Sequence, residues 1–94
     1  MKLVFYKKQF KKDYKLIKKQ YGKQISLLHT VIKLITLPES LDNKYKDHKL
    51  EGKYKNCREL HIKPDWLLIY QIDKNNNGNE IICFIRTGSH AELF

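Results

Sequence analysis

Three histidines in the second half of the chain stand among acidic and arginine side chains that could together move protons and hold a phosphate. The groups are His48, His61, His90, Asp65, Arg58 and Arg86. Histidine is the one side chain whose ordinary pKa lies near neutral pH, and the planar guanidinium of arginine matches the oxygens of a phosphate. In a strongly basic protein, this set of residues predicts an enzyme that cuts RNA.

The charge of the chain predicts an acidic partner. The 94 residues carry a formal charge of +9, and 41% of them are hydrophobic, which suits one folded domain over residues 1–94. Residues 1–24 contain nine lysines and one acid, or +8, and residues 25–94 contain ten bases and nine acids, or +1. Nucleic acid, an anionic membrane or an acidic protein would suit such a surface. Because the excess positive charge is N-terminal, we expect the surface that binds the acidic partner to be separate from the site that cleaves RNA.

The sequence predicts a cytoplasmic protein. No apolar run approaches the roughly 18 residues of a membrane span, and the first residues lack the pattern of a signal peptide. Two cysteines, Cys57 and Cys83, are too few for a disulfide framework, so both are expected to be reduced.

The N-terminal half predicts a strand followed by two helices. Lys2–Tyr6 is a short β-prone run. Apolar residues then recur on one face of a helix, at Phe10, Tyr14, Ile17 and Tyr21, and Gly22 signals its end. A second helical period runs from Ile25 to Ile35, and Pro38 stops it.

The C-terminal half predicts a long loop and three strands. Residues 39–56 are polar and lysine-rich, which is typical of a functional or mobile loop. The expected strands are 57–63, 66–72 and 80–87, and 89–94 forms a short tail. The fold class is therefore α+β: a β-α-α-β-β-β order with two helices packed on one face of a mostly antiparallel sheet.

This topology predicts where the chemical groups lie. A tight turn at Pro64 brings His61 near Asp65. The last strand, 80–87, returns antiparallel and ends near the start of strand 66–72, with His90 just beyond it. Alternation in the strand puts Glu59 and His61 on the face away from the helices. The loop that carries His48 could fold over the same face, so the groups are expected to converge there.

Several motifs in order resemble the YafQ-type branch of the RelE/ParE toxin superfamily. They are K-D-H in the loop, L-x-G, R-E-L-H-I-K-P-D, an apolar strand that ends in Tyr, and R-T-G-S-H-A-E-L-F at the C-terminus. The match covers about residues 44–94 motif by motif, and the helical half by pattern alone. The resemblance implies a RelE-like fold and a bacterial type II toxin, an endoribonuclease that cleaves messenger RNA in the ribosomal A site.

The resemblance also implies partners and site residues. The partners are messenger RNA, the ribosome and a neutralising antitoxin of the ribbon-helix-helix type, similar to DinJ or RelB. No cofactor and no metal are implied. The residues that match the catalytic set are His48, His61, Asp65 and His90, with Arg86 and Phe94 as contributors; Glu59 and Trp66 match positions implicated in some relatives.

Metal-free cleavage of RNA needs a base for the 2′-hydroxyl, a cation for the phosphorane and an acid for the leaving 5′-oxygen. His90 is assigned as the acid, and His48 and His61 are candidates for the base or a phosphate contact. Asp65 orients a histidine or acts as base. A phosphate clamp is favoured over a structural ion pair for Arg86, whereas Arg58 is expected to form a salt bridge.

Other residues are expected to contact the substrate. Phe94 could stack on a base, and so could Trp66, although core packing is favoured for the tryptophan. The loop presents Lys46, Lys49 and Tyr54 to RNA. The lysine face of the first helix could bind ribosomal RNA.

Three other interpretations compete. A ParE-like inhibitor of gyrase would lack the histidine set that is present here. An inert RNA-binding module would tolerate loss of His90. A zinc site made of His48, His61 and His90 is possible, but their spacing matches no ligand pattern.

Overall fold

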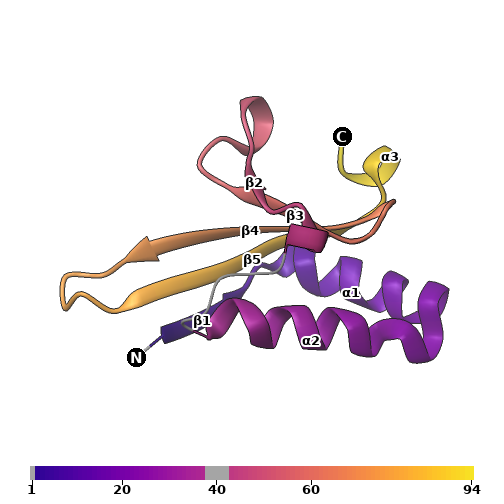
Figure 1. Cartoon of the computed structure of the whole chain (residues 1–94), viewed down its shortest axis with the longest axis horizontal. Coiled ribbons are helices and arrows are strands. Elements are labelled where there is room, and N and C mark those ends of the chain that lie inside the picture. The colour runs from indigo at the N-terminus through magenta and orange to yellow at the C-terminus, as the bar shows by residue number, and fades with distance from the viewer. Residues whose placement is uncertain (1, 38–42) are drawn as a thin grey trace.

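The protein folds as a five-stranded sheet with two helices packed on one face (Figure 1). The structure is a computed structural model, and it describes residues 2–37 and 43–94. The strand order is β1-β5-β4-β3-β2. The main elements are β1 (Lys2–Tyr6), α1 (Lys8–Tyr21), α2 (Ile25–Thr36), β2 (His48–Lys49), β3 (Arg58–Lys63), β4 (Trp66–Lys74), β5 (Glu80–Gly88) and α3 (His90–Leu93). The predicted α+β class and RelE-like order are confirmed.

The two helices form where the apolar period predicts them. In α1, Phe10 and Ile17 are buried, and Gly22 ends the helix with a φ of 55°, in the left-handed region that glycine adopts easily. In α2, Leu28, Val31 and Ile35 are buried. Pro38, predicted to stop this helix, lies outside the described residues.

The sheet is antiparallel except at one edge. β1 pairs in parallel with β5, and every other neighbouring pair is antiparallel. A two-residue turn at Pro64 and Asp65 joins β3 to β4, with Lys63 opposite Trp66. Ile69 lies opposite Arg86, so the end of β5 returns beside the start of β4, as predicted.

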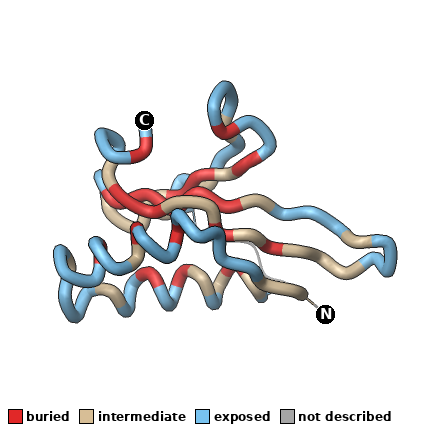
Figure 2. The backbone as a smooth tube through the Cα atoms, turned by 180° about the vertical axis from the view of Figure 1, so that it is seen from behind, coloured by how far each residue is buried: buried red, intermediate tan, exposed pale blue. Residues whose placement is uncertain are grey.

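The sheet is packed on both faces, but unequally. The main core lies between the sheet and the helices and includes Trp66, Phe84 and Leu60. A smaller cluster on the opposite face joins Tyr54, Cys57 and Leu93 with Leu67 and Ile69. Figure 2 shows the buried residues gathered in the middle of the sheet and on the helix sides that face it.

Two segments have more structure than the sequence predicted. The loop of residues 39–56, of which 43–56 are described, contains β2 and two single 3₁₀ turns, Asn43–Tyr45 and Gly52–Tyr54. The predicted tail forms the short helix α3. None of the helices in the described part of the chain has the length and hydropathy needed to cross a membrane.

Candidate active site

β3 carries the centre of the site on the face of the sheet that the helices leave uncovered. Leu60 and Ile62 belong to the main core, so Glu59 and His61 point to the opposite face, as alternation predicts. Glu59 Oε2 lies 3.7 Å from His61 Nε2. Its carboxylate is nearly buried, with a side-chain exposure of 7%.

His48 reaches the same carboxylate from the short strand β2. The register sets His48 directly opposite Glu59, and its Nε2 lies 3.0 Å from Glu59 Oε2. Its Nδ1 lies 2.7 Å from the carbonyl oxygen of Lys46. Each ring nitrogen of His48 therefore faces an oxygen that accepts hydrogen bonds.

The C-terminal tail supplies the other part of the site. Ser89 caps α3 in a reciprocal capping box with Glu92. Both the backbone N–H and the ring Nδ1 of His90 contact Asp65 Oδ1, at 3.0 and 2.7 Å. These hydrogen bonds, from the backbone first and then the ring, lower the pKa of Asp65.

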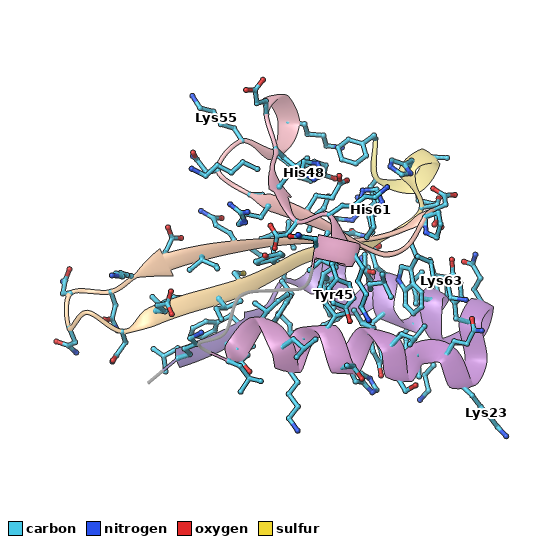
Figure 3. The ribbon with its side chains drawn as sticks, viewed as in Figure 1. Lys23, Tyr45, His48, Lys55, His61 and Lys63 are labelled. Carbon is cyan, nitrogen blue, oxygen red and sulfur yellow. The ribbon has the colours of Figure 1, made fainter. Side chains whose placement is uncertain are left out.

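The predicted convergence of the three imidazoles is confirmed. The ring centres of His48 and His61 are 6.2 Å apart, and those of His61 and His90 are 5.7 Å apart. Figure 3 shows His48 and His61 above the strands, on the side away from the helices. The exposed ring of Phe94 lies 6.5 Å from that of His90. Glu59 and Asp65 therefore each hold a histidine at one surface.

Arg86 does not stand ready as a phosphate clamp, so that expectation was wrong. Its Nε and Nη2 donate to the two carboxylate oxygens of Asp13 on α1, at 2.7 and 3.1 Å. Asp13 is buried, and it also accepts from the backbone N–H of Thr87 at 3.2 Å. The hydrogen bonds and charge of Asp13 raise the pKa of Arg86. Arg86 thus forms the structural ion pair, and not the phosphate clamp that was favoured from the sequence.

Trp66 packs in the core, as the sequence favoured, whereas Tyr54 is unsuited to the substrate contact expected of it. Trp66 is fully buried in the main core, stacks on Tyr21 and donates from Nε1 to Thr87 Oγ1. Tyr54 is buried in the second cluster, and its hydroxyl donates to the carbonyl of Leu93 at 3.0 Å. Burial of both rings removes the faces on which a base could stack.

The two lysines predicted to contact RNA differ in position. Lys46 is exposed, and its carbonyl orients His48. Lys49 is exposed too, but it lies opposite Arg58 in the register and thus on the other face of β2 from His48. It lines a cavity of about 710 Å³ beside β4 instead.

Two carboxylates that hold the site together were missed by sequence reasoning. Asp13 binds Arg86, and Asp47 binds Arg58 through an Nε–Oδ1 contact of 2.6 Å. The salt bridge expected of Arg58 is thus confirmed, with a partner that was not named. The D of the K-D-H motif was a signal for Asp47, whereas Asp13, in a helix of lysines, gave none beyond being the one acid among nine lysines.

The strand part of the site also has the composition of a metal site. His48, Glu59 and His61 each offer a ligand atom, and these atoms all lie within 4.8 Å of one another. Among the described residues, Glu59 Oε1 is buried without a hydrogen-bond partner. An orphaned carboxylate oxygen beside two imidazoles fits a transition-metal ion. Sequence spacing gave no such indication because His48 comes from β2, whereas Glu59 and His61 come from the neighbouring strand β3.

Known proteins resemble the chain over its whole length. The model of the family described as "Bacterial toxin of type II toxin-antitoxin system, YafQ" matches residues 2–94. The Escherichia coli K12 protein named "mRNA interferase toxin YafQ" is 38% identical over 91 residues, which cover 97% of this chain and 94% of that protein.

Solved structures agree in fold. YafQ in the E. coli DinJ–YafQ complex has a TM-score of 0.81 at 36% identity, covering 100% of this chain and 99% of that one. A metal-bound toxin from Helicobacter pylori has a TM-score of 0.84 at 41% identity, with 100% of both chains covered. The fold, the motifs and these likenesses together establish that the chain belongs to the YafQ family of type II toxins.

Proposed function

We propose that this protein is the toxin of a type II toxin–antitoxin pair and an endoribonuclease that cleaves messenger RNA. The observation that carries the proposal is the gathering of three imidazoles and two carboxylates, from separate stretches of chain, on one open face. Proton transfer at two positions of one phosphodiester needs at least two such groups. The name of the E. coli relative, an mRNA interferase, supports the same activity.

His90 acts as the general acid in this proposal. Asp65 fixes its Nδ1, so Nε2 is the nitrogen that gives a proton to the leaving 5′-oxygen. The 52% exposure of the His90 side chain allows the RNA to reach it.

The strand part of the site supplies the base and the cation. His61, which lies between His48 and His90, takes the proton of the 2′-hydroxyl. His48, held between two acceptors, carries the positive charge that stabilises the phosphorane, since Arg86 is already paired. The 2′-oxygen attacks phosphorus, the bond to the 5′-oxygen breaks, and the products are a 2′,3′-cyclic phosphate and a 5′-hydroxyl.

Phe94 and the lysines of α1 would contact the rest of the substrate complex. The exposed ring of Phe94 stacks on a base next to the scissile phosphate, a contact of about 1–3 kcal/mol. The lysines are exposed along α1, on the opposite layer from the imidazoles: Lys8, Lys11, Lys12, Lys15, Lys18 and Lys19. They bind ribosomal RNA while the message occupies the A site.

An antitoxin of ribbon-helix-helix type neutralises the toxin. A YafQ relative forms a complex with DinJ. An acidic segment that folds on binding suits a partner with a charge of +9.

A transition-metal ion is a second ligand of the same site. The cluster of His48, Glu59 and His61 favours it, and the H. pylori relative is described as metal-bound. Such an ion would occupy the imidazole nitrogens that cleavage needs, so it acts as an inhibitor and not as a cofactor. Addition of Zn²⁺ or Cu²⁺ should slow cleavage by the wild-type protein, and a chelator should restore it.

The variant His90→Ala tests the proposed function. Brief induction in E. coli should arrest growth and create new messenger-RNA ends that bear a 5′-hydroxyl, and His90→Ala should lose both. The matched control is His29→Ala, which removes a histidine that contacts Tyr14 across the two helices. New ends with His90→Ala at the wild-type level would refute the catalytic assignment. Growth arrest without new ends would favour a gyrase inhibitor or an inert RNA-binding module.

A further inference from the structure

Asp47 binds two neighbouring strands at once, although neither the motif nor the proposed reaction assigns it a role. Its Oδ1 accepts from Arg58 Nε at 2.6 Å, and its Oδ2 accepts from the hydroxyl of Tyr70. Arg58 on β3 and Tyr70 on β4 lie directly opposite each other in the register. The carboxylate of Asp47 therefore closes over a cross-strand pair.

Two of these three groups are largely shielded from water, which makes the contacts strong. The side chain of Asp47 is only 14% exposed, and Tyr70 is buried. Hydrogen bonds that involve a charged group are stronger than neutral ones, and exclusion of water strengthens them further. Burial, followed by the hydrogen bond and charge of Asp47, raises the pKa of Tyr70. Asp47 also raises the pKa of Arg58, although burial opposes the change.

The segment that Asp47 anchors is the one that orients His48. Lys46, one residue before Asp47, has a φ of 51°, which costs a non-glycine residue conformational energy. Its carbonyl accepts the hydrogen bond from His48 Nδ1 at 2.7 Å. The direction of that carbonyl sets the plane of the imidazole, and through it the approach of Nε2 to Glu59.

Strand pairing alone holds this segment weakly. β2 has two residues, and its register with β3 consists of two pairs. A strand of two residues forms few hydrogen bonds with its neighbour, so a side chain is needed to fix the preceding turn to the sheet. Asp47 is placed to do so, because its two oxygens reach β3 and β4.

We propose that Asp47, together with Arg58 and Tyr70, is a positioning device for His48 during RNA cleavage. The three residues hold the Lys46 carbonyl in place, and this carbonyl holds the ring. Asp47 acts through His48 and touches neither the phosphate nor the base. This inference rests on the proposed function, in which His48 is part of the cleaving site.

Two variants test the device from opposite ends. Asp47→Asn removes the charge at nearly constant size, and Tyr70→Phe removes one hydrogen bond and leaves the buried ring in the core. Misplacing a catalytic group by a fraction of an ångström lowers the rate and hardly affects substrate affinity. We expect kcat to fall by about 10-fold or more for each variant, with KM within about twofold of wild type. The control is Asp73→Asn, an exposed carboxylate on β4, and it should cleave normally.

A second measurement follows His48 without using RNA. The ¹⁵N resonances of the four imidazoles report the hydrogen bond at each ring nitrogen. The Nδ1 signal of His48 should shift in Asp47→Asn and in Tyr70→Phe, and that of His29 should not. Asp73→Asn should leave both signals in place.

The outcomes separate the two proposals. Wild-type cleavage by His48→Ala would remove His48 from the proposed function, and the resonance shifts would still measure its positioning. Impaired His48→Ala together with normal kcat in Asp47→Asn and Tyr70→Phe would overturn the positioning device. Loss of cleavage in those two variants with an unmoved His48 signal would also overturn it, since the loss would then follow another route.

Discussion

The two parts of the candidate site are held in different ways. The strand part consists of His48, Glu59 and His61, and it centres on a carboxylate with 7% side-chain exposure. The tail part consists of Asp65, His90 and Phe94, whose exposures are 69%, 52% and 59%. The sheet fixes the first part, whereas in the second part Asp65 lies in a turn, His90 begins a four-residue helix and Phe94 follows that helix. In the proposed mechanism, the buried part would stabilise charge and the exposed part would donate the proton.

The tail part depends on three attachments to the body of the protein. Asp13 binds Arg86 and the N–H of Thr87 just before the tail begins. Tyr54 binds the carbonyl of Leu93, whose side chain is buried. Asp65 binds His90 itself. Breaking these attachments one at a time shows how far the tail part can loosen while the strand part stays intact.

Arg86→Ala should have the largest effect on stability. It leaves the buried carboxylate of Asp13 without its cation, which costs about 3 kcal/mol for a buried pair. Thermal unfolding should move down by about 10 °C or more. Hydrogen exchange should increase at residues 87–94 more than at 58–63.

A companion variant separates this structural role from a phosphate clamp. Arg86→Ala combined with Asp13→Asn should recover part of the lost stability, because the unpaired charge is gone. If Arg86→Ala leaves the melting temperature unchanged and weakens binding of RNA, the result would instead support a phosphate-binding role for Arg86.

Tyr54→Phe should have a smaller effect that is confined to the tail part. It removes the hydroxyl that donates to Leu93 and keeps the ring beside Phe94. We expect a loss of about 1 kcal/mol in stability and a several-fold fall in cleavage rate. The control is Tyr45→Phe, on the helix side of the sheet, where Figure 3 places Tyr45. If Tyr45→Phe lowers cleavage as much, the attachment of α3 does not explain the loss.

Acid should release the tail part with the smallest effect of the three. Hydrogen bonds from His90 lower the pKa of Asp65 below its usual 3.8, so the folded protein binds this proton less readily than the unfolded chain. The contact therefore stabilises the protein above that usual pKa and is lost as the pH falls through the lowered value. The carboxyl ¹³C resonance of Asp65 should report this low midpoint. In His90→Ala the midpoint should rise only part of the way towards 3.8, because the backbone N–H of residue 90, the larger cause, remains; an unchanged midpoint would show that the imidazole ring does not contribute.

Much of the strand part could be predicted from local pattern. Alternation alone assigned Glu59 and His61 to the open face, because Leu60 and Ile62 must face the core. In the tail part, the turn at Pro64 likewise set the position of Asp65. Each of these inferences spans a few residues, over which backbone geometry leaves little freedom.

Partners distant in sequence were beyond such reasoning. Arg86 was expected to bind phosphate because an unpaired charge after an apolar strand would be costly. Its actual partner, Asp13, lies 73 positions earlier on a helix whose surface is otherwise rich in lysine. Asp47 was not singled out, whereas the neighbouring His48 was, because the partners of Asp47 are 11 and 23 positions away. The helix α3 was missed despite a readable signal, since Ser89 and Glu92 have the spacing of a capping box.

The parallel pairing of β1 with β5 has a consequence for folding during synthesis. β5 lies between β1 and β4 and pairs with both of them. It is nevertheless the last of the five strands in chain order. A nascent chain that stops before Glu80 therefore has no complete sheet on which its helices could settle. We expect such truncated chains to lack toxicity, because the sheet that carries the candidate site would be incomplete.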